Sequence, residues 1–144
     1  MLATFAFDVC HDVYRAAREV IDSKIPTVNL ETSGKYTWHP DRMPRLAEYV
    51  ADFALAGERA LEGHAKLHAA GALRASRMAM FRVFYLGGAE YHVARRHLGI
   101  SELTWADWAE EIRARVGGEL ARAGVFPPSK YFRESSVRVT GNVA

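Results

Sequence analysis

Histidine and cysteine side chains are the groups of this sequence that could bind a metal. His64 and His68 lie four residues apart, so on a helix they would share one face and could ligate a metal together. Two histidines make only half of a site, and the sequence names no third or fourth ligand. The pair Cys10–His11 is too sparse to complete one. We therefore interpret these residues as surface or structural groups and expect no metal.

Carboxylates in pairs could do general acid and base chemistry. Glu110 and Glu111 are adjacent, so on a helix they point in different directions and cannot work on one substrate atom. The sequence also has no HExxH motif, no phosphate-binding glycine loop, no nucleophile elbow and no CxxC pair. We expect neither an enzyme nor a bound cofactor.

Arginine side chains offer a different chemistry, the binding of anionic groups. The 144-residue chain has a net charge of +2. Residues 1–63 hold 7 Lys and Arg against 10 Asp and Glu, whereas residues 64–144 hold 12 against 7. A basic half suits an anionic partner. The candidates for phosphate contact lie in and around one central segment: Arg77, Arg82, His92, Arg95, Arg96, Arg113 and Arg115.

Helices must position these side chains, because apolar residues recur every three or four positions along most of the chain. We expect helices over residues 6–23, from residue 41 to about residue 61, from after Gly63 to residue 85, and up to about residue 123. These helices are separated or ended by an irregular arm at 24–40, by two glycines at 87–88 and by two prolines at 127–128. Gly57 falls on the apolar face of the second helix, where it would let a neighbouring element approach closely. Gly117 and Gly118 should weaken the middle of the last helix.

The segment YHVARRHLGISELTWADWAE has the spacing of two helices that pack across a tight turn. Counted from Tyr91 as position one, the ninth position is Gly99, and glycine tolerates the positive φ that the turn demands. Ser101 is a good N-cap for the second helix. The side chains expected to be buried between the helices are all apolar: Ala94, Leu98, Ile100, Trp105 and Trp108. The sequence therefore predicts a helix-turn-helix over residues 91–111.

Residues 81–120 resemble region four of bacterial sigma factors and related helix-turn-helix regulators. The residues that carry the likeness are Tyr85-Leu86-Gly87, then Tyr91, Ala94, Leu98-Gly99-Ile100-Ser101 and Thr104. The resemblance implies a DNA-binding protein whose second helix enters the major groove of double-stranded DNA. It implies contacts to DNA from that helix, by Ser101, Glu102, Thr104 and Asp107, beside the basic side chains named above.

The packing residues depart from the family's pattern at three positions. Arg95 stands where a small residue is usual, and Trp105 and Trp108 stand where Val, Ile or Leu is usual. We expect the small Ala94 to make room for the tryptophans and Arg95 to extend outward along its aliphatic stem.

The outward face of the second helix departs from the pattern as well. Its residues are Glu102, Leu103, Ala106, Asp107 and Glu110, of which three are acidic and none is basic. Carboxylates can accept a hydrogen bond from cytosine, but the negative charge of phosphates repels them. If Trp108 is buried and the carboxylates point outward without a basic rim, protein binding is favoured over DNA binding.

Two classes of function follow. The chain could be a small DNA-binding protein, either a transcriptional regulator of phage, plasmid or bacterial type or a DNA-packaging recognition subunit. In that case the acidic N-terminal helices would supply a homodimer or partner surface. Alternatively, a degenerate helix-turn-helix could act as an adaptor for another protein, such as part of the transcription machinery.

The fold class predicted is all-α, a small bundle of about five to six helices that contains the helix-turn-helix, an irregular arm and a short polar C-terminal tail. We divide the chain into an N-terminal helical region (1–63), the helix-turn-helix region (64–129) and the tail (130–144), within one compact domain. The tail's SSVRVT alternates enough to pair as a short strand. No apolar run approaches the length of a membrane span, and the single Cys10 fits a reducing compartment, so we expect a cytoplasmic protein without membrane contact.

Overall fold

The computed structural model describes residues 2–23, 43–64 and 75–132, and this part of the chain is helical, without a β-strand. Its α-helices are α1 (Leu2–Ser23), α3 (Met43–Ala60), α4 (Arg77–Met80), α5 (Tyr91–Leu98) and α6 (Glu102–Arg122). Two 3₁₀ turns, η2 (Glu62–His64) and η4 (Pro128–Tyr131), and one π-helix, η3 (Phe81–Leu86), complete it. The predicted all-α class is confirmed. The arm at 24–40, His68 and the predicted strand in the tail lie outside the described residues. None of the described helices is both long and apolar enough to cross a membrane.

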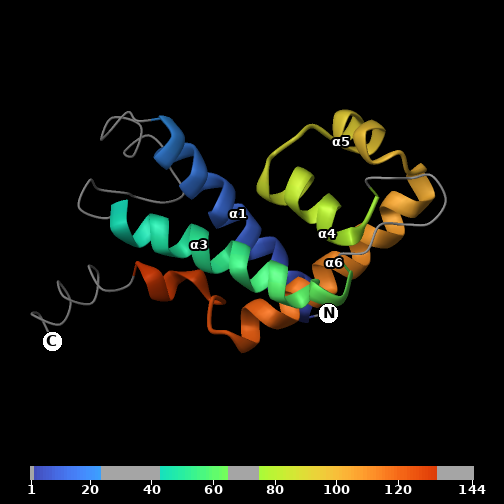
Figure 1. Cartoon of the computed structure of the whole chain (residues 1–144). Helices are drawn as coiled ribbons and strands as arrows, with labels where there is room; N and C mark the ends of the chain where they lie inside the picture. Colours follow the sequence, from blue (N-terminus) through green and yellow to red (C-terminus); the bar gives the residue numbers. More distant parts are fainter. Residues whose placement is uncertain (1, 24–42, 65–74, 133–144) are drawn as a thin grey trace, which may run out of the picture.

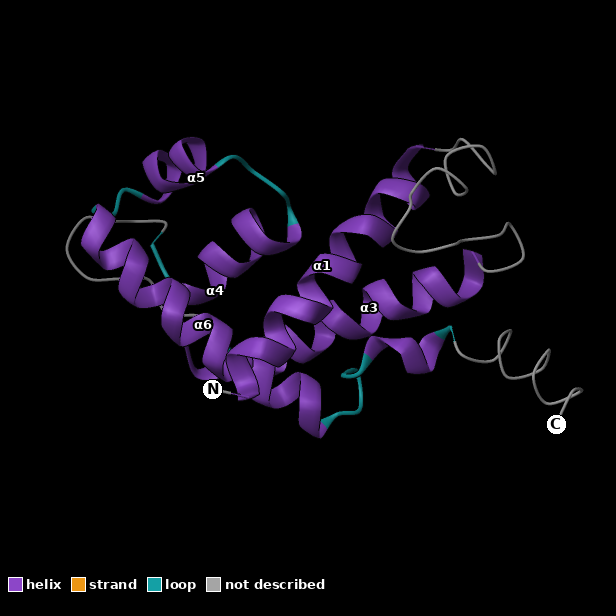
Figure 2. Cartoon of the chain, turned by 180° about the vertical axis from the view of Figure 1, so that it is seen from behind, coloured by secondary structure: helices purple, strands orange, loops and turns teal. Residues whose placement is uncertain are grey.

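Helix α6 runs through both parts of the fold (Figures 1 and 2). Its C-terminal half packs against α1 and α3, which lie side by side. Its N-terminal half supports α4, η3 and α5 at the other end of the molecule. The fold therefore joins a three-helix bundle to a smaller helical end through one long helix.

Helix α1 crosses α6 at a glycine. A Cβ atom on Gly117 would lie 1.8 Å from the carbonyl oxygen of Ala3, whereas a Cβ on the neighbouring Gly118 would meet nothing within 4 Å. The sequence predicted that both glycines weaken the middle of α6, and α6 runs through them without a break. Gly117 is the point where the backbones of two helices touch, and only a residue without a side chain fits there.

A second close approach joins α3 to η3. A Cβ on Gly57 would lie 2.0 Å from the ring of Phe81, so the ring packs directly on the α3 backbone. The predicted close approach at Gly57 is confirmed. Phe81 is fully buried and continues into an aromatic core through Phe53 and Tyr85, each with its ring centre 6.2 Å away.

Helix η3 ends at the two glycines, as the sequence predicted. The amide of Gly87 donates to the carbonyl of Arg82, five residues back, which is the wide turn of a π-helix. Gly88 then adopts a left-handed φ of 75°, and this turns the chain toward α5.

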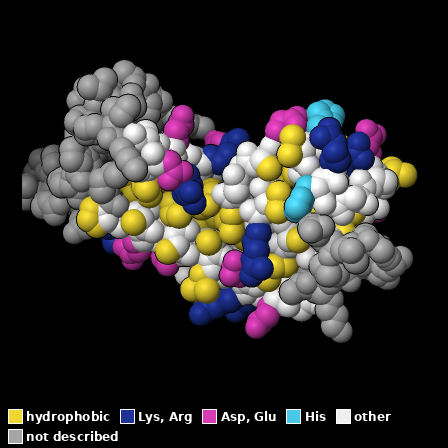
Figure 3. Space-filling model, turned by 45° about the horizontal axis from the view of Figure 1, so that its top comes forward, with side chains coloured by type: hydrophobic (Ala, Val, Ile, Leu, Met, Phe, Trp, Pro, Cys, Tyr) yellow, Lys and Arg dark blue, Asp and Glu magenta, His cyan; other side chains and the backbone are white. Residues whose placement is uncertain are grey.

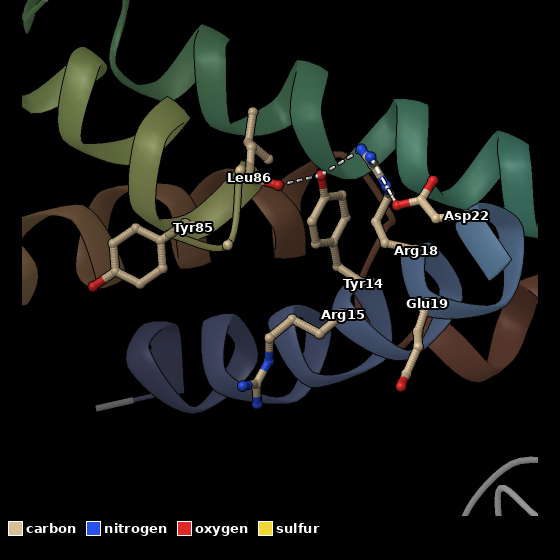
Figure 4. Close-up of a pocket in the computed structure, with 9 residues that line it drawn as sticks. Tyr14, Arg15, Arg18, Glu19, Asp22, Tyr85 and Leu86 are labelled. Atoms are coloured by element: carbon tan, nitrogen blue, oxygen red, sulfur yellow. Dashed lines mark hydrogen bonds and ion pairs between the residues drawn. The ribbon is translucent and has the colours of Figure 1, made fainter. Parts of the chain in front are cut away.

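The last two carbonyl groups of η3 receive donors from α1, and Figure 4 shows the one at Leu86. The Nε2 of His11 lies 2.9 Å from the carbonyl oxygen of Tyr85, and the hydroxyl of Tyr14 donates to the carbonyl of Leu86 at 3.1 Å. A carbonyl only accepts, so Nε2 carries the proton. These bonds satisfy carbonyl groups, which have no backbone partner at the C-terminal end of a helix, and they hold η3 against the bundle.

The structure adds detail to the prediction at three helix ends. Helix α1 begins at Leu2 rather than residue 6, because its first turn packs on α6 at Gly117. The described part of the third predicted stretch starts at Arg77, where the buried Ser76 caps it by accepting from the amide of Ala79 at 3.0 Å, and residues 65–74 lie outside the described residues. Helix α6 ends at Arg122, next to the predicted residue 123, but it is Gly124 that turns left-handed, at φ 82°, before the two prolines are reached.

Neighbouring glycine substitutions in α6 should act in opposite directions. Gly117→Ala places a methyl group against the Ala3 backbone, so we expect the free energy of unfolding to fall by about 2–3 kcal/mol. Gly118→Ala adds a methyl group in open space and should raise it by about 0.5–1 kcal/mol, since alanine restricts the unfolded chain. Urea denaturation followed by circular dichroism measures both. Equal effects of the two substitutions would contradict the close crossing of α1 and α6.

The stability of the fold should depend on pH through His11. Burial lowers the pKa of His11 below its ordinary value of 6.5. As pH falls below 6.5, the unfolded chain therefore binds the proton first, and the free energy of unfolding declines until the lowered pKa is passed.

His11→Gln isolates this effect, because the amide keeps an N–H for the carbonyl of Tyr85 but does not titrate. Thermal unfolding of both proteins should show that the advantage of wild type over the variant shrinks between neutral pH and about pH 5. An advantage that stays constant over this range would rule out a buried neutral His11.

Candidate functional site

Helices α5 and α6, with the turn between them, form the unit that the sequence singled out; we call it the α5–α6 unit. All the side chains predicted to lie between the helices are buried: Ala94, Leu98, Ile100, Trp105 and Trp108. The turn has the predicted geometry, with Gly99 left-handed at φ 71°. Ser101 is the N-cap of α6, and its Oγ accepts from the amide of Thr104 at 3.1 Å. The packing pattern read from the sequence is confirmed.

Glu90 is a cap that the sequence reading missed. Its carboxylate accepts from the amides of His92 and Val93, at 3.1 and 3.3 Å, and closes the N-terminus of α5. An acidic residue just before the predicted helix, after two helix-stopping glycines, was the available signal. Its negative charge also suits the positive end of the α5 dipole.

Aromatic contacts hold the tryptophans in place. Trp105 packs edge-on against Phe84 and Tyr91, with ring centres 4.9 and 5.1 Å apart. The guanidinium of Arg77 lies 4.8 Å from the ring centre of Trp108. Both indole rings are therefore structural, and they anchor the N-terminal half of α6.

Arg95 lies inward, and the prediction that it extends outward is wrong. Its Nη1 donates to the carbonyl of Ile100 at 3.1 Å, and its guanidinium lies 5.7 Å from the ring centre of Tyr91. Its Nε is buried without a partner. The carbonyl of Ile100 follows the turn and has no partner within a helix, so a donor at position 95 stabilises the turn. Arg95 is thus part of the scaffold.

Four other arginines proposed for phosphate contact are paired with carboxylates. Arg77 and Arg115 both bind Glu111, at 2.7 and 2.9 Å. Burial would raise the pKa of Glu111, but hydrogen bonds from the two arginines outweigh it and hold the pKa below its usual range. The remaining two pairs are Arg82 with Glu58 at 3.1 Å and Arg113 with Asp8 at 2.7 Å. The pairs of Arg77, Arg82 and Arg113 join different elements, and the pair of Arg115 lies within α6, so these charges are used within the fold.

Two faces of the unit remain open to solvent. We define the α5 face as His92, Val93, Arg96 and His97. We define the α6 face as Glu102, Leu103, Ala106, Asp107 and Glu110. Figure 3 looks onto this end of the molecule, where arginine and histidine side chains stand beside acidic ones. Each face also carries an exposed apolar side chain, Val93 at 52% and Leu103 at 80% exposure.

The α6 face is acidic. Glu102 and Asp107 form no ion pair within the described residues, and Glu110 makes only an exposed contact of 3.4 Å with Arg113. Arg113 itself is held by Asp8, so it does not form a basic rim. Of the residues predicted to contact DNA from this helix, Ser101 and Thr104 are used in the cap, where the Oγ of Ser101 also donates to the Oγ1 of Thr104 at 3.1 Å.

The α5 face is the positive counterpart. Arg96 makes no ion pair with any described residue and is exposed, with His92 one turn before it and His97 next to it. Glu90 lies nearby, but its carboxylate is turned back onto the α5 amides. Arg96 and His92 are thus the predicted phosphate contacts that the structure leaves accessible, and the exposed His97 lies beside them.

A cavity of about 210 Å³ lies between α1 and the end of η3 (Figure 4). Its polar groups bind one another: Tyr14 is bonded to Leu86 and accepts from Arg18 at 3.4 Å, and Arg18 pairs with Asp22 at 3.1 Å. Arg15, at the rim, pairs with Asp12 at 2.8 Å. The cavity therefore offers no unpaired cation to a ligand.

Comparison with protein-family models, with curated proteins and with solved structures finds no match to this chain. The resemblance to region four of sigma factors thus rests on the residues quoted above. In the part of the chain that the structure describes, no three His, Cys, Asp or Glu side chains come together as a metal site.

Adjacent arginines of α5 should differ in their contribution to stability. Arg95→Ala removes the bond to the carbonyl of Ile100, and we expect the free energy of unfolding to fall by about 1–2 kcal/mol. Arg96→Ala removes only an exposed side chain and should change it by less than about 0.5 kcal/mol. Urea denaturation followed by tryptophan fluorescence reports both. A larger loss for Arg96→Ala would overturn the assignment of Arg95 to the scaffold.

Proposed function

We propose that this chain is a protein-interaction adaptor, and that its α6 face binds a basic surface of a partner protein. One observation carries the proposal: the second helix of the unit presents three carboxylates and an 80% exposed leucine, without a Lys or Arg among them. Exposed carboxylates attract a cationic partner and repel phosphates. Leu103 supplies an apolar contact that stabilises the complex after the charges have brought the two proteins together.

The scaffold supports this use of α6. The Ser101 cap, the turn bonded by Arg95 and the buried tryptophans fix the first turns of the helix before any partner arrives. A helix ordered in advance loses little conformational entropy on binding, so even a small face can contribute affinity. An amphipathic helix that lays its apolar side chains into a groove is a common mode of protein recognition, and Leu103 would serve as one such anchor.

A second candidate is DNA binding through the α5 face. The observation in its favour is that Arg96 is exposed and unpaired between two histidines, on a unit whose packing positions follow the helix-turn-helix pattern. A transcriptional regulator or a DNA-packaging subunit would use such a contact to grip phosphates. The carboxylates of the α6 face argue against it, because they would lie toward the same DNA.

Selection from a library of displayed peptides tests the adaptor function. We expect wild type to select peptides with several Lys or Arg residues around an apolar one. Glu102→Lys combined with Asp107→Lys should weaken binding of these peptides by about tenfold or more. Glu19→Lys combined with Glu62→Lys makes the same change in net charge at exposed sites elsewhere and is the matched control. If both double variants lose binding equally, the loss comes from the change in net charge and not from the α6 face, and the proposal is contradicted.

Titration with random-sequence duplex DNA over a salt series separates the two candidates. Each phosphate contact contributes about −0.9 to the slope of log affinity against log salt. For an adaptor we expect no binding beyond the weak attraction of Arg96. Tight binding with a steep slope that Arg96→Glu abolishes would replace the adaptor with the DNA-binding function.

A further inference from the structure

We propose that the α6 face of one copy of this chain docks on the α5 face of a second copy. This inference rests on the proposed function, since it names one basic surface that the α6 face can bind. The partner is present wherever the chain itself is present. The sequence assigned a homodimer contact to the N-terminal half, and the surface inferred here is a different one.

Charge complementarity between the two faces is the first argument. The α6 face carries Glu102, Asp107 and Glu110, and the α5 face carries Arg96 between His92 and His97. Most arginines near the unit are neutralised within the fold, as the pairs of Arg77, Arg82 and Arg113 show. Arg96 is therefore a cation that remains available to a carboxylate of another molecule.

Apolar side chains at matching places give the second argument. Leu103 is 80% exposed amid the carboxylates, and Val93 is 52% exposed beside Arg96 and the two histidines. In a contact between the faces, each would be covered while the charges meet around it. This is the arrangement of an interface with an apolar centre and a polar rim.

Rigid placement of both faces is the third argument. They lie on consecutive helices joined by the bonded turn at Gly99 and Ile100, so every copy presents both in one fixed relation. Two different faces make a heterologous contact, which either closes reciprocally or extends head to tail. Each face covers few residues, so the association belongs to the weak and transient class.

Sedimentation of the full chain tests the proposal. We expect the mean mass to rise above that of the monomer between micromolar and millimolar concentration, and to fall back as salt screens the charges. Arg96→Glu alone, or Glu102→Lys with Asp107→Lys, should each weaken association by about tenfold or more. Glu19→Lys with Glu62→Lys should leave it close to wild type.

Mixing the two defective variants gives the decisive result. Each alone has like charges on both of its faces, but together they offer complementary pairs, so a 1:1 mixture should associate again. A wild-type chain that stays monomeric, or a mixture that does not recover, overturns the proposal. If peptide selection by the α6 face still succeeds, the adaptor function stands and only the second copy is excluded as its partner. If peptide selection fails too, both the adaptor function and the contact between two copies are contradicted.

Discussion

The two hydrogen bonds from α1 to the end of η3 are the constraint on which the rest of the structure depends. A π-helical turn followed by a left-handed glycine leaves the carbonyls of Tyr85 and Leu86 directed away from the backbone donors that follow. His11 and Tyr14 supply the missing donors. These donors belong to the long N-terminal helix α1. They therefore fix the position of the C-terminal end of η3 relative to the bundle. The two glycines then lead directly to the Glu90 cap, so the position of α5 follows from the same contact.

Charge pairing within the fold decides what remains on the surface. The second half of the sequence is basic, yet its arginines reach carboxylates on other elements: Arg82 binds Glu58 on α3, and Arg113 binds Asp8 on α1. Exposed pairs of this kind add little stability individually. Their effect on function is larger, because a neutralised arginine no longer attracts phosphates at long range. In the described part of the basic half, these pairs therefore leave little unpaired positive charge, and the described residues give the acidic α6 face no cationic rim.

Local patterns in the sequence predicted the inside of the α5–α6 unit well. Apolar spacing, Gly99 and Ser101 depend on neighbours within a turn or two, and the structure has them as expected. Arg95 was misjudged because a long side chain can extend toward solvent or fold back to a carbonyl, and only the geometry of the turn decides between them. The pair of Arg113 with Asp8 joins residues far apart in the chain, so no local pattern could reveal it. The role of Gly117 was missed for the same reason, since its contact at Ala3 belongs to a distant helix.

The buried and the exposed residues of a helix pair are subject to different physical constraints. A resemblance in the buried residues therefore supports the same fold, but it does not by itself support the same function. Buried positions must be apolar and must match in volume, whereas outward positions are free to change without loss of the fold. An acidic outward face on a well-packed helix-turn-helix interior is therefore physically consistent. The carboxylates also restrict what Leu103 can bind, because an exposed leucine alone would adhere to any apolar surface. Surrounded by Glu102 and Asp107, it is kept from acidic surfaces, including the α6 face of another copy, and is directed toward cationic ones. Repulsion between two α6 faces is thus what favours the unlike pairing of α6 with α5.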